Sequence, residues 1–119
     1  DVILSDDTIL QPDLLYVAKS RRHIIKQRVE GPPDLVIEII SGTSRRDRIE
    51  KLDLYATHGV SEYWIVDPAA QVIEFLLNEN GHFVVQTAVN DRYQSPRLPE
   101  AAIQVADFWR QVDEEMAAN

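Results

Sequence analysis

Two carboxylates and one lysine are the residues of this sequence whose types and spacing could do chemistry together. Glu38 interrupts the apolar run 35–40, where a carboxylate is costly unless it is paired or binds a cation. Asp13 stands at the entry to the preceding apolar segment, and Lys51 lies on the segment that leaves the Glu38 strand. Oxygen ligands of one Mg²⁺ lie only about 2.0–2.1 Å from the ion, so two carboxylates that share it normally come from neighbouring strands. Asp13 and Glu38 meet that condition.

Asp34 is the competing acid, because it also follows a proline. It lies four residues before Glu38 on the same strand, about 13 Å away at roughly 3.3 Å per residue. We therefore interpret Asp34 as a strand-entry residue. Simple structural alternatives exist for the other acids too: Asp13 could cap a turn, and Glu38 could form a buried ion pair with a helix Arg or Lys.

Lys51 also has two readings. It could form a surface pair with Asp47, worth a few tenths of a kcal/mol. Alternatively, it leans over the Glu38 strand as a cation, since the helix that carries it leaves that strand directly. These alternatives stay open on the residues alone.

The elements that position these residues follow from hydrophobic patterning. Apolar runs predict a short strand over 14–18, a central strand over 34–40 and another strand over 60–67. Apolar spacing predicts a helix from Ser44 to His58, with Ser44 and Asp47 as a weak capping box and Gly59 as its C-cap. Asn78 to Gly81 predicts a hairpin turn between 72–77 and 82–88, and a last helix is predicted over about 105–117. The strand–helix–strand order predicts a right-handed crossover to a parallel neighbour, in a mixed sheet of an α/β or α+β domain.

Composition limits the classes of protein. A length of 119 residues predicts one domain over 1–119. Cysteine is absent, which excludes disulfides, thiolate catalysis and Cys-ligated zinc. The three His are too scattered to suggest a zinc site, so any metal is expected to be held by oxygen. No apolar run approaches the roughly 18 residues of a membrane span, and the expected location is cytoplasmic. The chain begins with Asp rather than Met, and we expect upstream sequence to be missing.

Charge is unevenly distributed along the chain. The net charge is −8, yet residues 19–51 hold nine basic and five acidic residues. This segment could face a polyanion, although a charge run is often only a solvated face. The predicted nucleic-acid contacts within it are Arg21, Arg22, Lys26, Arg45, Arg46 and Arg48.

Four motifs occur in order: Pro12-Asp13, the PDLVIEI run 33–39, the helix segment 44–56 and the GVSEYWIVDP run 59–68. Together they closely resemble the Uma family of restriction-endonuclease-like proteins, within the PD-(D/E)xK nuclease superfamily and long a domain of unknown function. The likeness extends from about Asp1 to Trp109. It implies a restriction-endonuclease-like mixed sheet with a β-β-α-β core, in which the family's N-terminal helix and hairpin are missing.

The resemblance implies a Mg²⁺ (or Mn²⁺) site formed by Asp13, Glu38 and the carbonyl of Ile39. The metal activates a water that attacks a phosphodiester, and a lysine stabilises the developing charge. Ile40 stands where the superfamily has that lysine. Lys51 is the expected substitute, positioned by Asp47 and Tyr55.

The expected function is a Mg²⁺-dependent endonuclease that acts on DNA. Two alternatives remain: a catalytically silent scaffold, for example a homodimer through its sheet edge or hairpin, and a nucleic-acid binder that does not cleave. A nuclease is expected to be stabilised by Mg²⁺ or Mn²⁺, and to lose this stabilisation in Glu38→Ala. A scaffold is expected not to respond to the metal.

Overall fold

The structure is a computed structural model of the chain, and it describes residues 1–41 and 45–118, with only the backbone of Arg45. The chain forms two compact units, Asp1–Gln86 and Thr87–Asn119. The predicted single domain over 1–119 stays a prediction. Ser44, one of the two residues of the predicted capping box, lies outside the described residues.

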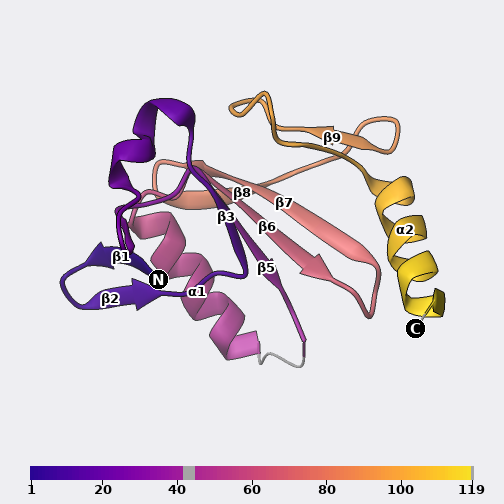
Figure 1. Cartoon of the computed structure of the whole chain (residues 1–119), viewed down its shortest axis with the longest axis horizontal. Coiled ribbons are helices and arrows are strands. Elements are labelled where there is room, and N and C mark those ends of the chain that lie inside the picture. The colour runs from indigo at the N-terminus through magenta and orange to yellow at the C-terminus, as the bar shows by residue number, and fades with distance from the viewer. Residues whose placement is uncertain (42–44, 119) are drawn as a thin grey trace. The chain divides into compact units, whose positions relative to one another are not determined.

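The first unit is built on a five-stranded sheet of order β3-β5-β6-β7-β8 (Figure 1). Its strands are β3 (Leu14–Tyr16), β5 (Leu35–Ile39), β6 (Glu62–Asp67), β7 (Val72–Glu79) and β8 (His82–Gln86). β5 and β6 are parallel, and every other neighbouring pair is antiparallel. Helix α1 (Arg45–Thr57) connects β5 to β6. The predicted mixed sheet with a β-β-α-β core is therefore confirmed.

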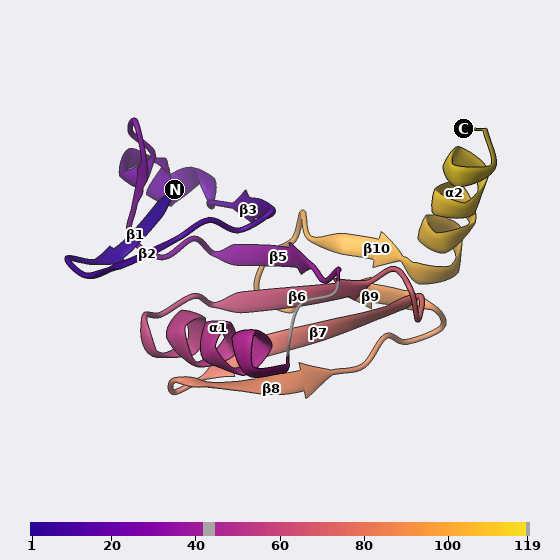
Figure 2. The ribbon, with the colours of Figure 1, turned by 90° about the horizontal axis from the view of Figure 1, so that it is seen from below.

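Helix α1 lies against one face of this sheet, as Figure 2 shows. The core between them consists of Val36, Tyr55, Val60, Tyr63, Ile65 and Leu76. Side chains alternate along a strand, so Tyr63 and Ile65 face α1 while Trp64 lies on the other face, where its ring meets that of Phe75 at a centroid distance of 5.1 Å. Burying each large apolar side chain contributes about 1.5–3 kcal/mol, which fixes the side of the sheet that α1 covers.

The C-terminal end of α1 is held by Asn78 at the end of β7. Gly59 has φ +88°, the left-handed conformation expected after a helix end. The amide nitrogen of Asn78 donates to the carbonyl oxygens of Ala56 at 2.9 Å and Val60 at 2.8 Å. Its side-chain oxygen accepts from Gly81 N at 2.8 Å. One side chain thus joins the helix end to the β7–β8 turn.

Asn78→Ala is expected to lower the free energy of unfolding by about 2 kcal/mol, because it removes the side-chain donor to the carbonyl of buried Val60. Urea unfolding measures this loss. The matched control is Asn80→Gly in the same turn, where φ is +55° and glycine is well tolerated. Equal stability of the two variants would contradict the role given to Asn78.

Short elements complete the first unit. Strands β1 (Val2–Ser5) and β2 (Thr8–Leu10) form an antiparallel hairpin, and β4 (Val29–Glu30) pairs with β1 in parallel. A 3₁₀ helix, η1, spans Lys19–Ile24. The patterning placed no strand ahead of Pro12, and a hairpin was expected to be missing there, whereas the structure contains one.

The second unit contains the antiparallel pair β9 (Arg92–Gln94) and β10 (Ala102–Gln104), followed by α2 (Val105–Ala118). The predicted last helix is confirmed, and the two strands were not predicted. Within the described ranges, no helix has the length and apolar character needed to cross a bilayer.

Candidate active site

Glu38 is buried on β5, with 8% of its side chain exposed, and receives both of its side-chain partners from α1. Tyr55 donates its hydroxyl to Glu38 Oε1 at 2.8 Å. Lys51 Nζ lies 3.5 Å from Glu38 Oε2. Lys51 and Tyr55 are four residues apart, which places them on one stripe of the helix. The ion pair expected as the structural alternative for Glu38 is therefore present, and it involves the lysine predicted for catalysis.

Asp13 reaches the same end of β5 from the neighbouring strand. Leu14 pairs with Ile37, so Asp13 follows at the next step of the antiparallel register, beside Glu38. Asp13 Oδ2 accepts a hydrogen bond from the backbone N–H of Ile39 at 2.7 Å. The N–H and C=O of one strand residue point to the same neighbouring strand, so the carbonyl of Ile39 is directed toward the edge at which Asp13 lies.

The charges of Glu38 and Asp13 affect a tyrosine on the α1 side of the sheet. Burial raises the pKa of the Tyr63 hydroxyl, and the charges of Glu38 and Asp13 raise it further. Burial likewise raises the pKa of Tyr55, followed by the charge of Glu38 and the hydrogen bond to it. Both phenols stay protonated at neutral pH, so Tyr55 is a hydrogen-bond donor to Glu38.

Stability is expected to fall as the pH rises above 10, the ordinary pKa of tyrosine. A raised folded-state pKa means that the unfolded chain loses its phenolic proton first, so this contribution is complete below pH 10 and lost above it. The loss is about 1.4 kcal/mol per pH unit for each tyrosine. Urea unfolding on either side of pH 10 should show a shallower fall in Tyr63→Phe than in the wild type. Identical slopes would contradict the burial of this phenol.

The role of Asp47 and Tyr55 in positioning Lys51 stays a prediction. The hydroxyl of Tyr55 binds Glu38 directly. Asp47 is an exposed residue of the first turn of α1. The pair that the structure gives Lys51 is with Glu38. Tyr55 and Lys51 therefore hold different oxygens of one carboxylate.

Asp34 has a separate structural task, as expected of a strand-entry residue. Asp34 Oδ2 accepts from the backbone N–H of Ala18 at 2.7 Å and lies 3.1 Å from Arg21 Nη1. The carboxylate therefore joins the start of β5 to the segment before η1.

Three of the six predicted nucleic-acid contacts are engaged in ion pairs within the chain. They are Arg21 with Asp34 at 3.1 Å, Lys26 with Glu30 at 3.0 Å and Arg46 with Glu50 at 3.4 Å. The pairs of Lys26 and Arg46 are exposed, and such pairs contribute about 0–1 kcal/mol, so a phosphate could compete for these two cations. Arg22 is exposed on η1, Arg48 is half-buried on α1, and the Arg45 side chain lies outside the described residues.

A small cavity of about 230 Å³ lies between α1 and the sheet. It is lined by Arg48, Ile49, Leu52, Ile65 and Glu74. Glu74, which lines this cavity, was not singled out from the sequence. Its position depends on the register of β6 with β7, which the residues alone did not reveal.

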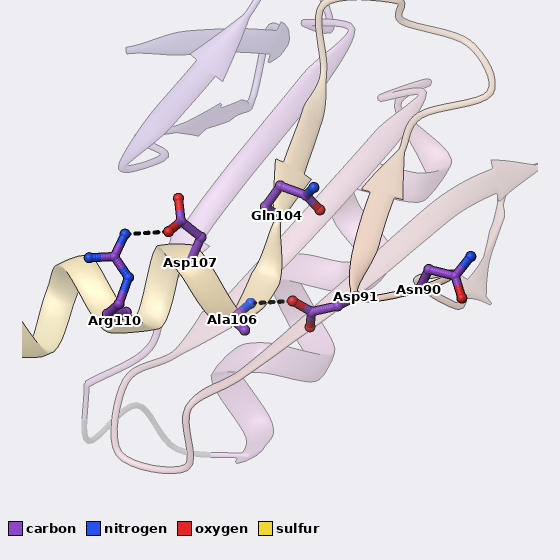
Figure 3. A pocket seen from close by; sticks show the side chains of 6 residues that line it. All are labelled: Asn90, Asp91, Gln104, Ala106, Asp107 and Arg110. Atoms are coloured by element: carbon purple, nitrogen blue, oxygen red, sulfur yellow. Dashed lines mark hydrogen bonds and ion pairs between the residues drawn. The ribbon is translucent and has the colours of Figure 1, made fainter.

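A larger hollow of about 560 Å³ lies in the second unit (Figure 3). Its polar groups bind one another: Asp91 Oδ2 accepts from Ala106 N at 2.9 Å, which caps the start of α2, and Arg110 pairs with Asp107. Asp91 holds this position with φ +62°. This arrangement is explained by helix capping.

The residues at the end of β5 fit a hard divalent ion. Among residues 1–41 and 45–118, no three His or acidic side chains gather closely enough to hold a metal alone. Mg²⁺, however, is commonly bound by one or two carboxylates plus waters and substrate phosphates. Asp13 and Glu38, with the carbonyl of Ile39, supply a donor set of that type.

Comparisons place this chain in a known family. The model of the Uma2 family, described as "Putative restriction endonuclease", matches residues 1–107. The chain is also similar to a crystal structure described as "a putative nuclease belonging to DUF820 from Anabaena variabilis ATCC 29413", with a TM-score of 0.57 and 19% identity over 79% of this chain. It spans 52% of that protein, about half its length, and at this identity the likeness concerns the fold alone. No curated protein matches the chain. The chain belongs to the Uma2 family and has the restriction-endonuclease-like fold of the solved nuclease-like relative.

Proposed function

We propose that this chain carries the centre of a divalent-metal-dependent endonuclease that hydrolyses phosphodiester bonds in DNA. The observation that carries the proposal is the convergence of Asp13, Glu38 and Lys51 at one end of β5. Family membership supports nuclease chemistry at that point. The chain spans about half of its solved relative, so the activity of a whole protein is part of the proposal. The predicted homodimer and cytoplasmic location stay predictions.

In this proposal, Asp13, Glu38 and the Ile39 carbonyl hold Mg²⁺ or Mn²⁺. The bound ion supplies Lewis acidity and lowers the pKa of water. Tyr55 fixes one oxygen of Glu38 at 2.8 Å, which leaves Oε2 to face the ion and Lys51. The pair with Glu38 holds the ammonium of Lys51 near the reacting phosphate, where its charge stabilises the transition state.

In this proposal, Lys51 replaces the superfamily's lysine, whose position is occupied by Ile40 in this chain. Ile40 donates its backbone N–H to Val66 O at 2.9 Å on β6 and packs against the core cluster, so this position serves the sheet. Lys51 reaches Glu38 from α1, which covers the face of the sheet on which the Glu38 side chain lies. A cation can therefore act at the centre without a lysine two residues after Glu38.

The test is cleavage of plasmid DNA with Mg²⁺, with Mn²⁺ and with a chelator. Asp13→Asn is expected to slow metal-dependent cleavage by roughly 100-fold or more, because it weakens the hold on the ion. Asp53→Asn, which changes an exposed acid of α1, is the matched control and should cleave at the wild-type rate. Cleavage that persists in chelator, or that Asp13→Asn leaves unchanged, would remove the metal centre from the account.

A further inference from the structure

Directly paired strand residues connect the cavity beside α1 with the proposed catalytic centre. Glu38 on β5 pairs with Ile65 on β6, and Ile65 pairs with Glu74 on β7. Directly paired residues project from the same face of a sheet. Glu38 and Glu74 are therefore on the α1 face, two strand spacings or about 10 Å apart.

This cavity has apolar walls and two charged side chains. Ile65, Leu52 and Ile49 provide the apolar lining, and Ile49 keeps 55% of its surface exposed although it lies on α1. Arg48 and Glu74 complete the lining. Within the part of the chain that the structure describes, neither Arg48 nor Glu74 makes a hydrogen bond or ion pair.

The apolar walls and the two charged side chains of the cavity favour some classes of small ligand over others. A free phosphate would meet the carboxylate of Glu74, and a purely aliphatic group would make no use of the two charged side chains. A nucleobase has apolar faces that fit between isoleucine and leucine side chains, and its edge carries hydrogen-bonding groups. A carboxylate accepts hydrogen bonds and recognises exocyclic amino groups, such as N4 of cytosine.

We propose that the cavity formed by Arg48, Ile49, Leu52, Ile65 and Glu74 receives an unpaired nucleobase of the strand being cleaved, next to the reacting phosphate. The inference rests on the proposed function and adds the class of substrate: DNA that is single-stranded or opened at this nucleotide. A base inside a duplex is stacked and cannot enter such a pocket without leaving the helix. Glu74 then selects bases that present an amino group, cytosine over thymine, and Arg48 neutralises the adjoining phosphate.

The experiment uses single-stranded oligonucleotides that carry one cytosine in a thymine background, moved step by step along the strand. The sites cleaved with Mg²⁺ are mapped for the wild type, Glu74→Gln, Ile49→Ser and the control Asp53→Asn. At one position, cytosine is expected to favour cleavage by roughly 5- to 150-fold. The preference should disappear in Glu74→Gln and shrink in Ile49→Ser, whose position is exposed enough to tolerate a polar residue, and Asp53→Asn should keep it.

Affinity supplies a second readout that does not depend on turnover. Lys51→Met, which is designed to bind without cutting, is titrated with cytosine- and thymine-containing strands in Mg²⁺, with and without Glu74→Gln. Cleavage without any base preference, or a preference that Glu74→Gln leaves intact, overturns the nucleobase pocket while the proposed nuclease stands. Absence of both cleavage and Mg²⁺-dependent binding in the wild type overturns the nuclease, and the pocket with it.

Discussion

Glu38→Gln is expected to reduce metal-dependent DNA cleavage by at least about 100-fold while the domain stays folded. Glutamine keeps the size of the side chain and can still accept the hydroxyl of Tyr55, but it has no negative charge with which to hold a divalent ion. Lys51 loses its partner, yet 38% of its side chain is exposed, so its ammonium can turn to water. The stability cost should therefore be small, about 1 kcal/mol.

Cleavage rates in Mg²⁺ and thermal unfolding, measured on the same preparation, separate these two effects. Glu50→Gln is the control, because Glu50 is an exposed acid of α1 whose partner is Arg46. A folded Glu38→Gln variant that cleaves within a few-fold of the wild type would show that this carboxylate is only half of a structural ion pair.

Lys51→Met is expected to lower the rate constant of cleavage by about 100- to 1000-fold, the effect typical of removing one transition-state contact. Methionine keeps an unbranched apolar stem beside the sheet and removes only the ammonium. Binding of the divalent ion should be retained or become tighter, because Glu38 no longer shares its charge with a lysine. If Lys51 is catalytic, its replacement should therefore lower the rate of cleavage without lowering the affinity for the divalent ion.

The matched control is Lys19→Met, a change to an exposed lysine on η1. Lys51→Arg should recover part of the rate, since it restores a cation with a different shape. Loss of rate that is matched by an equal loss of folded protein would assign Lys51 a purely structural role.

Much of the core was predictable because its elements carry strong local signals. The apolar run before Glu38, the helical spacing that ends at Gly59 and the hairpin turn at Asn78 to Gly81 all specify their elements locally. The structure places β5, α1 and the β7–β8 hairpin there. By contrast, β2, β9 and β10 are strands of three residues, too short for alternation to distinguish them from loops.

The site was predictable only in part. Asp13 could be matched with Glu38 because one ion requires carboxylates from neighbouring strands, and these strands do pair. The hydrogen bond from Tyr55 to Glu38 and the placement of Glu74 in the cavity beside α1 could not be predicted. Both depend on how strands and helix pack, and a shift of register by one residue would turn each strand side chain to the other face.

The metal centre is tested most directly by calorimetric titration of the wild type and of Glu38→Gln with Mn²⁺, in the absence of DNA. We expect the wild type to bind one ion, and this binding to be lost, or weakened by at least about tenfold, in the folded variant. Equal binding by both proteins, or no binding by either, would contradict a metal centre formed by the carboxylates of β5 and its neighbouring strand.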